Sequence, residues 1–421
     1  MANDQYDIAI VGGGMGGLAL ALKLSRAGLR VVLLERQPSI TTARRGELLQ
    51  PNGLKVLDRL GLLPGVLALP VHRNERFHFH RIGRGRLLTV DYRELPPPIN
   101  YSLVTLPQHL MGLFERELRR EPNMTLLLET AMVELWREDG RVAGLVAAHG
   151  AERWRIRARM VVGSDGAFSQ VRRAAGIAAR THVYADAYLT LVVPRPPGFD
   201  RDARYYVGRR QILGAFPVND HELYLFYMIR ARDREAHRRA GLERLRHSIG
   251  AIDAALVPAV ETVRDWESVG YMPCVRVRAR TWVGDRVALI ADAAHAMNPH
   301  VAQGRNQALE DALTLGERIL DCARRDTWDA ASLAPYERSR RPQVTLLQRQ
   351  GDEMELFWNS GWWPLTWLRD RSFARIEANP RLRRQVLALI AGMSDRPLSW
   401  CDRLIAAGVL PEMSRAPIRT H

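Results

Sequence analysis

Tyr6-Asp-Ile-Ala-Ile-Val-Gly-Gly-Gly-Met-Gly-Gly17 decides the fold of this chain. Its apolar start predicts a buried strand, and the stretch Leu18–Ala27 that follows predicts a helix. The spacing Gly12-x-Gly14-x-x-Gly17 assigns each glycine a task. The first makes a tight turn, the second lets the backbone approach a phosphate, and the third lets the helix pack closely on the strand. The helix N-terminus then offers free N–H groups to a pyrophosphate.

A second strand and an acidic residue complete this unit. Val31–Leu34 is apolar, and Glu35 follows it at about 20 residues beyond the glycines. A carboxylate there accepts hydrogen bonds from ribose hydroxyls and repels a 2′-phosphate. The order strand, glycines, helix, strand and acid therefore favours a Rossmann-like βαβ unit over an ordinary glycine turn. The dinucleotide that it predicts has an unphosphorylated ribose, as FAD and NAD have.

Two later motifs repeat this logic. Val161–Arg172 predicts a short buried strand, an Asp-Gly turn at Asp165-Gly166 and the start of a helix. Arg286–His295 predicts a strand that ends in the acid Asp292, and Pro299–Asn306 then opens a further helix. With these three motifs in this order, the sequence resembles the class A flavoprotein monooxygenases, the single-component aromatic hydroxylases with the para-hydroxybenzoate hydroxylase fold.

The resemblance covers most of residues 5–345 and implies an α/β fold. This fold has a Rossmann-like FAD-binding domain, an inserted β-sheet substrate domain and C-terminal helices. The motif positions assign to the FAD-binding domain residues 1–75, 101–180 and 275–345, to the substrate domain residues 76–100 and 181–274, and to the C-terminal helical region residues 346–421.

The resemblance also implies which residues hold FAD. The ADP half is assigned to Gly12, Gly14, Gly17, Glu35 and Arg36. The remaining assignments are Arg45 beside the mobile flavin, Gln108 at the flavin side, Asp165 and Gly166 for FAD and the nicotinamide cofactor with Arg172 in support, Asp292 for the ribityl chain, and Pro299, Gly304 and Asn306 along the isoalloxazine ring.

Three residues depart from the family pattern. The family usually has glycine where this chain has Ala291 and Ala302. A methyl group is tolerated at both points if φ is negative there, so FAD binding is expected to survive. Arg305 replaces the Met or Val of the family, and its guanidinium lies either near the flavin rim or out in solvent.

The chemistry that the resemblance implies belongs to the cofactor. In the family, NADPH or NADH reduces the flavin, O₂ adds at the C4a position, and the distal oxygen of the hydroperoxide attacks an electron-rich aromatic carbon. The protein keeps the site dry and orients an aromatic or quinone-like substrate. No nucleophile or metal is required, and no residue of the sequence is assigned as the substrate-activating base.

Other functions stay open beside hydroxylation. The runner-up is a flavin-dependent reductase or dehydrogenase that acts on an apolar or prenylated substrate. A flavin-dependent halogenase would need an active-site lysine and a Trp-x-Trp-x-Ile-Pro run. Lys23 and Lys55 are the only lysines, neither in a suitable place, and Trp362-Trp-Pro-Leu-Thr-Trp367 is a different pattern. A non-enzymatic FAD-binding protein is poorly motivated.

Composition excludes several partners. The chain has 421 residues, which favours two domains, and a formal charge of +15. Its arginines are scattered along the chain, which favours solvated helix faces over a nucleic-acid patch. No run approaches the roughly 18 apolar residues that span a bilayer, and the N-terminus lacks the pattern of a signal peptide. Three cysteines without metal-ligand spacing indicate a reducing cytoplasm.

Period-two alternation predicts the strands of the substrate domain, in a sheet with one buried face. These strands are Phe77–His80, Leu87–Tyr92, Ala187–Val193, Arg204–Val207, Gln211–Pro217 and Glu222–Ile229. Their tyrosines are interpreted as packing residues, one of which could orient a phenolic substrate: Tyr205, Tyr206, Tyr224 and Tyr227. His78-x-His80 lacks a third ligand nearby, so no metal site is expected. His295 is expected to form local hydrogen bonds.

The C-terminal region contains four clustered tryptophans, Trp358, Trp362, Trp363 and Trp367. Packing of a helix on the core is the favoured interpretation of this cluster. A roof over an apolar substrate tunnel and a peripheral place at a membrane interface are the alternatives. Asn379-Pro380 then breaks the chain before a predicted amphipathic helix over Leu382–Ile390.

Overall fold

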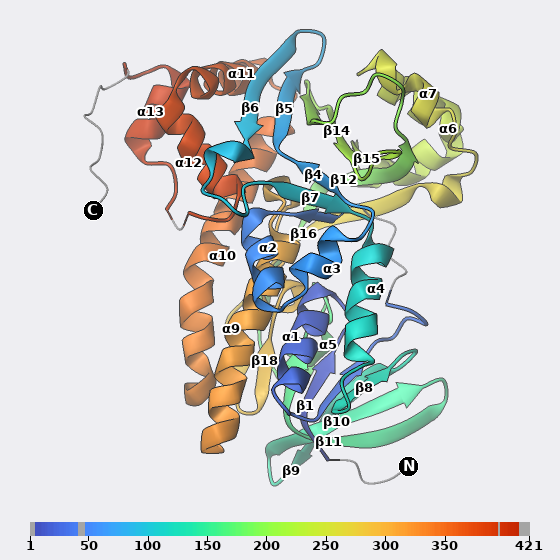
Figure 1. Cartoon of the computed structure of the whole chain (residues 1–421), viewed down its shortest axis with the longest axis vertical. Helices are drawn as coiled ribbons and strands as arrows, with labels where there is room; N and C mark the ends of the chain where they lie inside the picture. The colour runs from blue at the N-terminus through green and yellow to red at the C-terminus, as the bar shows by residue number, and fades with distance from the viewer. Residues whose placement is uncertain (1–4, 41–46, 395, 412–421) are drawn as a thin grey trace.

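The computed structural model describes residues 5–40, 47–394 and 396–411. Two large sheets lie at opposite ends of the elongated molecule, an eight-stranded sheet near the N-terminus and a seven-stranded sheet at the other end (Figure 1). A three-stranded sheet of β3 (Glu47–Leu49), β7 (Ser102–Thr105) and β4 (His72–Asn74) lies between them in Figure 1. The α/β fold with C-terminal helices is therefore confirmed.

The eight-stranded sheet is the core of the Rossmann-like part. Its main path runs β17-β18-β11-β1-β2-β8, with β10 and β9 attached to β11. Strands β18, β11, β1, β2 and β8 are mutually parallel. The apolar runs of the first four are buried because both faces are covered, whereas the edge strand β8 is half-buried. The strands are β1 (Gln5–Val11), β2 (Val31–Leu34), β8 (Met124–Leu127), β9 (Ala131–Glu138), β10 (Arg141–His149), β11 (Glu152–Gly163), β17 (Val283–Gly284) and β18 (Val287–Leu289).

Helices attach to this sheet in the order that the glycine motif predicts. Helix α1 (Met15–Arg26) follows β1 directly and packs against α9 (Gly304–Arg325). A Cβ atom on Gly16 would lie 3.3 Å from the carbonyl oxygen of Ala308, so the two helices meet at a small residue. The other helices here are α2 (Pro51–Arg59), α3 (Leu63–Leu67), α4 (Pro107–Leu118), α5 (Gln170–Ala174) and α8 (Asp292–His295).

The seven-stranded sheet contains all six predicted strands of the substrate domain. Its order is β16-β12-β15-β14-β13-β5-β6, and only the pair β13–β5 is parallel. The strands are β5 (Arg76–Arg81), β6 (Gly85–Asp91), β12 (Ala179–Pro194), β13 (Ala203–Val207), β14 (Ile212–Pro217), β15 (Glu222–Arg230) and β16 (Gly270–Ala279).

The expectation of one buried face in this sheet is wrong, because both faces are covered. Along β15 the side chains alternate between two separate apolar clusters: Leu223 and Leu225 join one, Tyr224 and Met228 the other. Helices α6 (Arg234–Gly250) and α7 (Val257–Val260) cover the first cluster, and α11 (Trp363–Ala378) and α12 (Pro380–Ile390) cover the second. Alternating side chains along a strand indicate that it has two different faces. They do not show whether the second face of the sheet meets solvent or a second apolar cluster.

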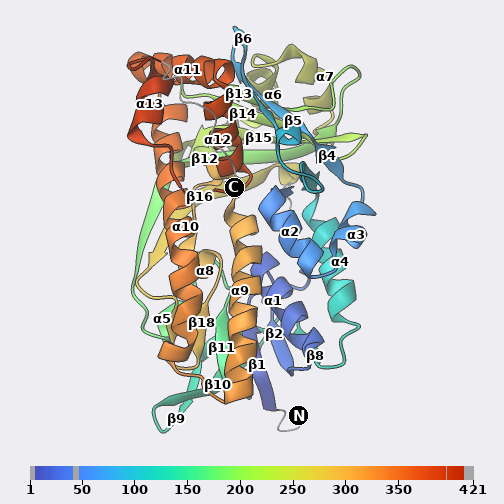
Figure 2. The ribbon, with the colours of Figure 1, turned by 60° about the vertical axis from the view of Figure 1, so that its left-hand side comes forward.

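The C-terminal helices join the two ends of the molecule. Helix α10 (Ala330–Trp358) runs beside α9 along the long axis (Figure 2) and continues to the seven-stranded sheet, where α11, α12 and α13 (Trp400–Ala407) lie. Of the four tryptophans, only Trp358 is buried, at 8% exposure. The packing interpretation is wrong for Trp362, Trp363 and Trp367, whose exposed fractions are 63%, 65% and 56%.

We expect Gly17→Ala to destabilise the fold. The added Cβ would lie 2.2 Å from the carbonyl oxygen of Gly12, and overpacking of this kind costs roughly 1–3 kcal/mol. The matched control is Gly112→Ala in α4, where no atom lies within 4 Å of the added Cβ and where the change should be neutral or stabilising by about 0.5–1 kcal/mol. Urea unfolding measures both values, and equal stabilities would contradict the close approach.

Candidate functional site

The predicted cofactor motifs converge at one edge of the parallel sheet. Gly12 follows β1, Glu35 follows β2, Asp165 comes just after β11, and Asp292 follows β18 and begins α8. Since these strands are adjacent and parallel, their carboxyl ends lie together, which is where ligands bind in open α/β sheets. The structure therefore brings together motifs that are widely separated in the sequence.

The glycine loop has the backbone geometry that its spacing predicts. Gly12 has φ +105°, and a Cβ there would lie 2.4 Å from the carbonyl oxygen of Ser164. Gly14 precedes α1 in extended backbone, and no atom lies within 4 Å of its hypothetical Cβ. The first turn of α1 has neither a capping side chain nor an acidic residue. The positive end of this helix dipole therefore remains available to an anion beside Gly14.

Glu35 is held beside this loop by backbone donors. One carboxylate oxygen accepts a hydrogen bond from the N–H of Gly13 at 2.8 Å, and the other accepts one from the N–H of Gln37 at 2.9 Å. A carboxylate oxygen accepts more than one hydrogen bond, so the half-buried side chain retains acceptor capacity for ribose hydroxyls. Arg36, the next residue, is exposed.

Of the two carboxylate oxygens of Asp165, one accepts hydrogen bonds and the other is unpaired among the described residues. Its Oδ2 accepts hydrogen bonds from the N–H groups of Gln170 at 2.6 Å and Val171 at 3.1 Å. Its Oδ1 is buried without a partner in the part of the chain that the structure describes, as is the hydroxyl of Ser164. Unpaired buried polar atoms are costly. The next residue, Gly166, has φ +84°, and no atom lies within 4 Å of its hypothetical Cβ. Two unpaired polar atoms next to such open space fit a bound polar ligand such as FAD.

Arg172 connects this turn to the loop that bears Asp292. Its buried guanidinium donates to the carbonyl oxygens of Ala293 at 2.6 Å and Ala167 at 2.9 Å. Burial lowers the pKa of Arg172 from its ordinary value. The residue therefore positions two cofactor motifs relative to each other through backbone oxygens.

Both alanines that replace family glycines have positive φ. Ala291 has φ +55° and ψ −142°, and Ala302 lies in the left-handed region with φ +50° and ψ +33°. The expected condition of negative φ is thus wrong at both positions. Backbone of this kind costs of order 1–3 kcal/mol per residue when it bears a side chain, so surrounding contacts must hold it.

A buried carboxylate in α9 holds the first alanine. Asp311, which is fully buried, accepts a hydrogen bond from the N–H of Ala291 at 2.9 Å and contacts Nε2 of His295 at 2.5 Å. Its second oxygen accepts from Nε of Arg340 at 3.0 Å. Burial alone would raise the pKa of Asp311, but the charges of His295 and Arg340 hold it below its ordinary value. The sequence feature that could have identified Asp311 is the position of an acidic residue among the apolar residues of the buried stripe of a helix.

Asn306, in the first turn of the same helix, holds the second alanine. Its side-chain amide donates to the carbonyl oxygen of Ala302 at 2.9 Å and to that of Leu48 at 3.3 Å, and its Oδ1 accepts from the N–H of Gln50 at 3.0 Å. The side chain is fully buried, and both of its polar atoms already have partners within the protein. An approach of Asn306 to a flavin would therefore use its backbone.

The rest of the predicted flavin segment lies around the start of α9. Pro299 begins a 3₁₀ turn, Pro299–Val301, and a Cβ on Gly304 would find its nearest neighbour 4.0 Å away. No side chain caps the N-terminus of α9, which leaves its first amides for an anion. Gln108 is exposed in the first turn of α4. Arg45 lies outside the described residues.

His300, between Pro299 and Gly304, is a polar centre that the sequence analysis missed. Its Nδ1 lies 2.8 Å from the hydroxyl of Tyr205, and its Nε2 lies 2.8 Å from Oδ1 of Asn359 and 3.2 Å from the hydroxyl of Tyr188. Burial lowers the pKa of His300 to about 4. Both tyrosines belong to the seven-stranded sheet, so this contact joins the predicted flavin segment to the substrate domain.

The bond from Asn359 to a carboxylate identifies the tautomer of His300. The amide nitrogen of Asn359 donates to Oδ2 of Asp186 at 2.9 Å, so its Oδ1 faces the imidazole as an acceptor. Nε2 of the neutral ring must then carry the proton, and Nδ1 must accept the proton of the Tyr205 hydroxyl. The imidazole is thereby a hydrogen-bond acceptor toward the sheet.

The other histidines of interest have local partners. His295 forms the local hydrogen bond that was predicted, to Asp311. His78 contacts the hydroxyl of Thr89 at 3.0 Å and Asp202 at 3.1 Å, and the His80 ring lies beside Tyr206. Within the described ranges, no group of three or more His, Cys, Asp and Glu residues has the arrangement of a metal site.

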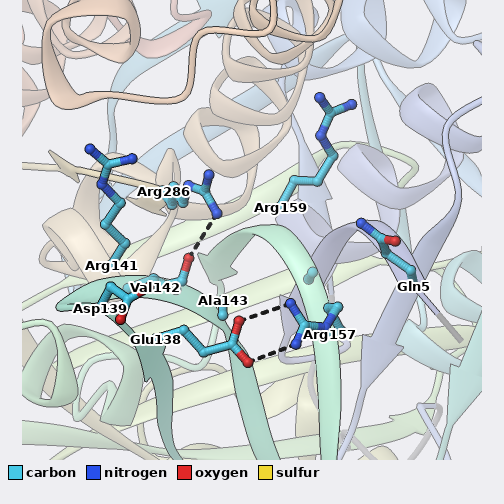
Figure 3. A pocket seen from close by; sticks show the side chains of 10 residues that line it. Gln5, Glu138, Asp139, Arg141, Val142, Ala143, Arg157, Arg159 and Arg286 are labelled. Carbon is cyan, nitrogen blue, oxygen red and sulfur yellow. Dashed lines mark hydrogen bonds and ion pairs between the residues drawn. The ribbon is translucent and has the colours of Figure 1, made fainter. Parts of the chain in front are cut away.

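An arginine-rich pocket lies at the opposite edge of the parallel sheet (Figure 3). Gln5, at the start of β1, and Arg286, just before β18, line it together with Arg141. Figure 3 shows Glu138 paired with Arg157, and Arg286 donating to the carbonyl oxygen of Val142 at 3.2 Å. Its place at the amino ends of the strands separates it from the four cofactor motifs.

Comparisons with known proteins agree with this geometry. The model of a family described as "FAD binding domain" matches residues 5–350. The chain is 32% identical over 340 residues to the 6-methylpretetramide 4-monooxygenase of Streptomyces rimosus, covering 80% of this chain and 81% of that protein. It is 26% identical over 406 residues to the 3-demethoxyubiquinol 3-hydroxylase of Escherichia coli (strain K12), covering 93% and 100%. The structure of p-nitrophenol 4-monooxygenase PnpA from Pseudomonas putida DLL-E4 shares the fold, with a TM-score of 0.81, 22% identity and coverage of 93% and 99%.

We expect Asp311→Asn to destabilise the fold and to lower FAD retention. Removing one partner of a buried ion pair costs about 3–5 kcal/mol, and Ala291 loses the acceptor that holds it. Because the pKa of Asp311 is depressed in the folded state, its contribution is complete above about pH 4 and is lost as the pH falls further. Urea unfolding and the absorbance of bound flavin measure these effects.

The matched control is Asp321→Asn in the same helix, whose carboxylate pairs with Arg318 and Arg324 at the surface. That change should cost less than about 1 kcal/mol and leave flavin binding unaltered. Equal effects of the two substitutions would show that Asp311 does not hold the loop.

Proposed function

Because the chain belongs to the FAD binding domain family and is a class A FAD-dependent monooxygenase, we propose that it uses NADPH or NADH and O₂ to hydroxylate an aromatic or quinone-like ring. One observation carries the proposal: the predicted flavin segment and the aromatic face of the seven-stranded sheet meet at His300. A substrate next to this contact would lie beside the cofactor and against the rings of the sheet. We also propose a cytoplasmic location, which the cysteine content supports.

Bound FAD would supply the activation of O₂ and the transfer of one oxygen atom. The residues that would hold it are those at the carboxyl edge of the parallel sheet, with Glu35 at the adenosine ribose, Asp165 and Asp292 toward the flavin, and the amides of α1 and α9 at its anionic groups. The chain then has three tasks: to bind the ring, to exclude water and to handle a proton.

Aromatic side chains dominate the proposed ring site. The Tyr205 ring lies 5.3 Å from that of Phe79 and 5.3 Å from that of Trp358, and Phe226 lies 5.5 Å from Tyr205. Such surfaces favour planar, weakly polar ligands. The names of the relatives mention a pretetramide and a ubiquinol, and a fused-ring phenol or a quinol fits the same surface in this chain.

Tyr205 and His300 are placed to handle the substrate proton. Nδ1 of the neutral imidazole accepts a hydrogen bond from the Tyr205 hydroxyl, and the hydroxyl oxygen of Tyr205 can in turn accept a hydrogen bond from a substrate hydroxyl. A phenol that donates such a hydrogen bond gains electron density in its ring, which favours attack by an electrophilic oxygen. We propose this relay as the activating device.

Reaction under labelled dioxygen tests the proposed hydroxylation. A true substrate should accelerate NADPH or NADH oxidation, and mass spectrometry should find one labelled oxygen atom in the product. Fused-ring phenols and quinols form the first substrate panel, because both classes fit the aromatic surface. A product that has gained only hydrogen, and that forms equally well without oxygen, would support the alternative reductase acting on an apolar or prenylated substrate.

The proton relay is tested by Tyr205→Phe, with the neighbouring Tyr206→Phe as control. We expect a fall in kcat of roughly a hundredfold for the first change, a typical contribution of general acid–base catalysis. FAD content and KM should stay near their original values. Tyr206 faces the opposite cluster and donates its hydroxyl proton to Asp253, so its substitution should leave kcat unchanged. Equal kcat values for the two variants would exclude the relay.

A further inference from the structure

Helix α11 exposes two tryptophans and buries an arginine on its opposite stripe. Trp363, Trp367 and Arg371 succeed one another at intervals of one helical turn and all face solvent. The opposite stripe is buried and includes Arg369, at 2% exposure, beside Phe373 and Ile376. The usual arrangement of a surface helix, with apolar residues inside and polar residues outside, is therefore partly reversed.

The exposed tryptophans belong to α11, to the residue before it and to α13. Figure 1 shows these two helices at one end of the molecule. We define this surface, the tryptophan face, as Trp362, Trp363 and Trp367 together with Trp400, Leu404 and Val409. Trp400 is 79% exposed and Val409 is 68% exposed. The end of α13 is joined to α11 by a hydrogen bond from Nε of Arg371 to the carbonyl oxygen of Ala407 at 3.3 Å. Large exposed apolar groups on two helices that contact each other are typical of a surface that another partner covers.

Arginines accompany the tryptophans. The guanidinium of Arg371 lies 5.4 Å from the ring centre of Trp367, and that of Arg403 lies 5.5 Å from the ring centre of Trp400. Arg209 donates to the carbonyl oxygen of Gly361, immediately before Trp362, at 3.2 Å. This combination of rings and cations is typical of contact with an anionic interface.

The acidic groups of the same region are paired with arginines, one of which, Arg403, is the arginine beside Trp400. Asp370 pairs with Arg81 at 3.1 Å and with Arg369 at 2.8 Å. Asp402 pairs with Arg381, and Glu353 pairs with Arg403 at 2.9 Å. Arg209 and Arg371 have neutral carbonyl partners. The tryptophan face therefore has a surplus of positive charge.

We propose that the tryptophan face docks on an anionic phospholipid surface. Tryptophan places its apolar ring among acyl chains and its N–H among headgroups, and arginine binds phosphate. Among the described residues, no helix is long and apolar enough to cross a bilayer, so the contact would be peripheral. A second copy of this chain is a poorer match, because two identical cationic faces repel each other.

Docking in this orientation would bring the bilayer close to the aromatic cluster of the substrate sheet. Phe373 and Ile376, on the inner side of α11, belong to the same apolar cluster as Tyr205 and Trp358. A substrate dissolved in the bilayer would then have a short route to the proposed ring site. This second step rests on the proposed function, whereas the docking itself does not.

Vesicle co-sedimentation of the FAD-loaded protein tests the docking. We expect binding to vesicles of phosphatidylcholine with phosphatidylglycerol, weaker binding to phosphatidylcholine alone, and a loss of affinity with added salt. Trp363→Ser combined with Trp367→Ser should lower the partition coefficient by at least about tenfold. Arg209→Glu combined with Arg371→Glu should lower it selectively on anionic vesicles.

The matched charge control is Arg238→Glu with Arg239→Glu, on the exposed surface of α6, which should bind the vesicles as the original protein does. Retained flavin absorbance and far-ultraviolet circular dichroism verify the folding of each variant. Equal partition of the original protein and the tryptophan variant would overturn the proposal. The proposal would also be overturned if sedimentation showed a concentration-dependent dimer of the original protein that the tryptophan variant does not form. Hydroxylation of a water-soluble substrate, measured separately, distinguishes failure of docking from failure of the proposed function.

Discussion

The candidate site depends on a buried carboxylate, Asp311, which is held between Arg340 and His295. A charge in this environment is tolerated only when it is paired and fully hydrogen-bonded. That requirement makes the arrangement specific, because each oxygen has partners from different parts of the chain. One partner is the N–H of Ala291, so the position of the loop before Asp292 is coupled to the most buried part of α9.

The same helix acts on a second loop through its first turn. Asn306 binds the carbonyl oxygen of Ala302, and α9 also packs against α1 behind the glycine loop. One helix thus positions all the segments assigned to the pyrophosphate, the ribityl chain and the flavin ring. His300, in the 3₁₀ turn just before α9, then reaches the tyrosines of the other sheet. The predicted flavin segment and the seven-stranded sheet are consequently joined by a few polar contacts along a single stretch of chain.

The sequence predicts those parts of the structure that local patterns determine. Glycine spacing identifies the first βαβ unit, and alternation identifies strands such as β13 and β15, because both depend on neighbouring residues. The positive φ of Ala291 depends instead on Asp311, 20 residues further along the chain. That of Ala302 depends on Asn306, which is near in sequence but is itself held by Leu48 and Gln50, far from it in the chain. No local pattern reveals these contacts. Likewise, the seven-stranded sheet is covered on its second face by helices from the end of the chain. The tryptophans were predicted as packing residues because aromatic residues are usually buried, and a functional surface is where that expectation is weakest.

The two alanines have a consequence for the mobility of the site. Glycine explores left-handed and right-handed backbone with similar ease, whereas alanine in the left-handed region occupies a narrow minimum. A segment with alanine at both points therefore has fewer alternative conformations than one with glycine, once Asp311 and Asn306 hold it there. The cost is backbone strain in the folded state, offset by buried hydrogen bonds that are present only in that state. The loops beside the proposed flavin position are in this way restrained to one geometry. His300 extends this restraint across to the other sheet, because its ring is hydrogen-bonded to the hydroxyls of Tyr205 and Tyr188.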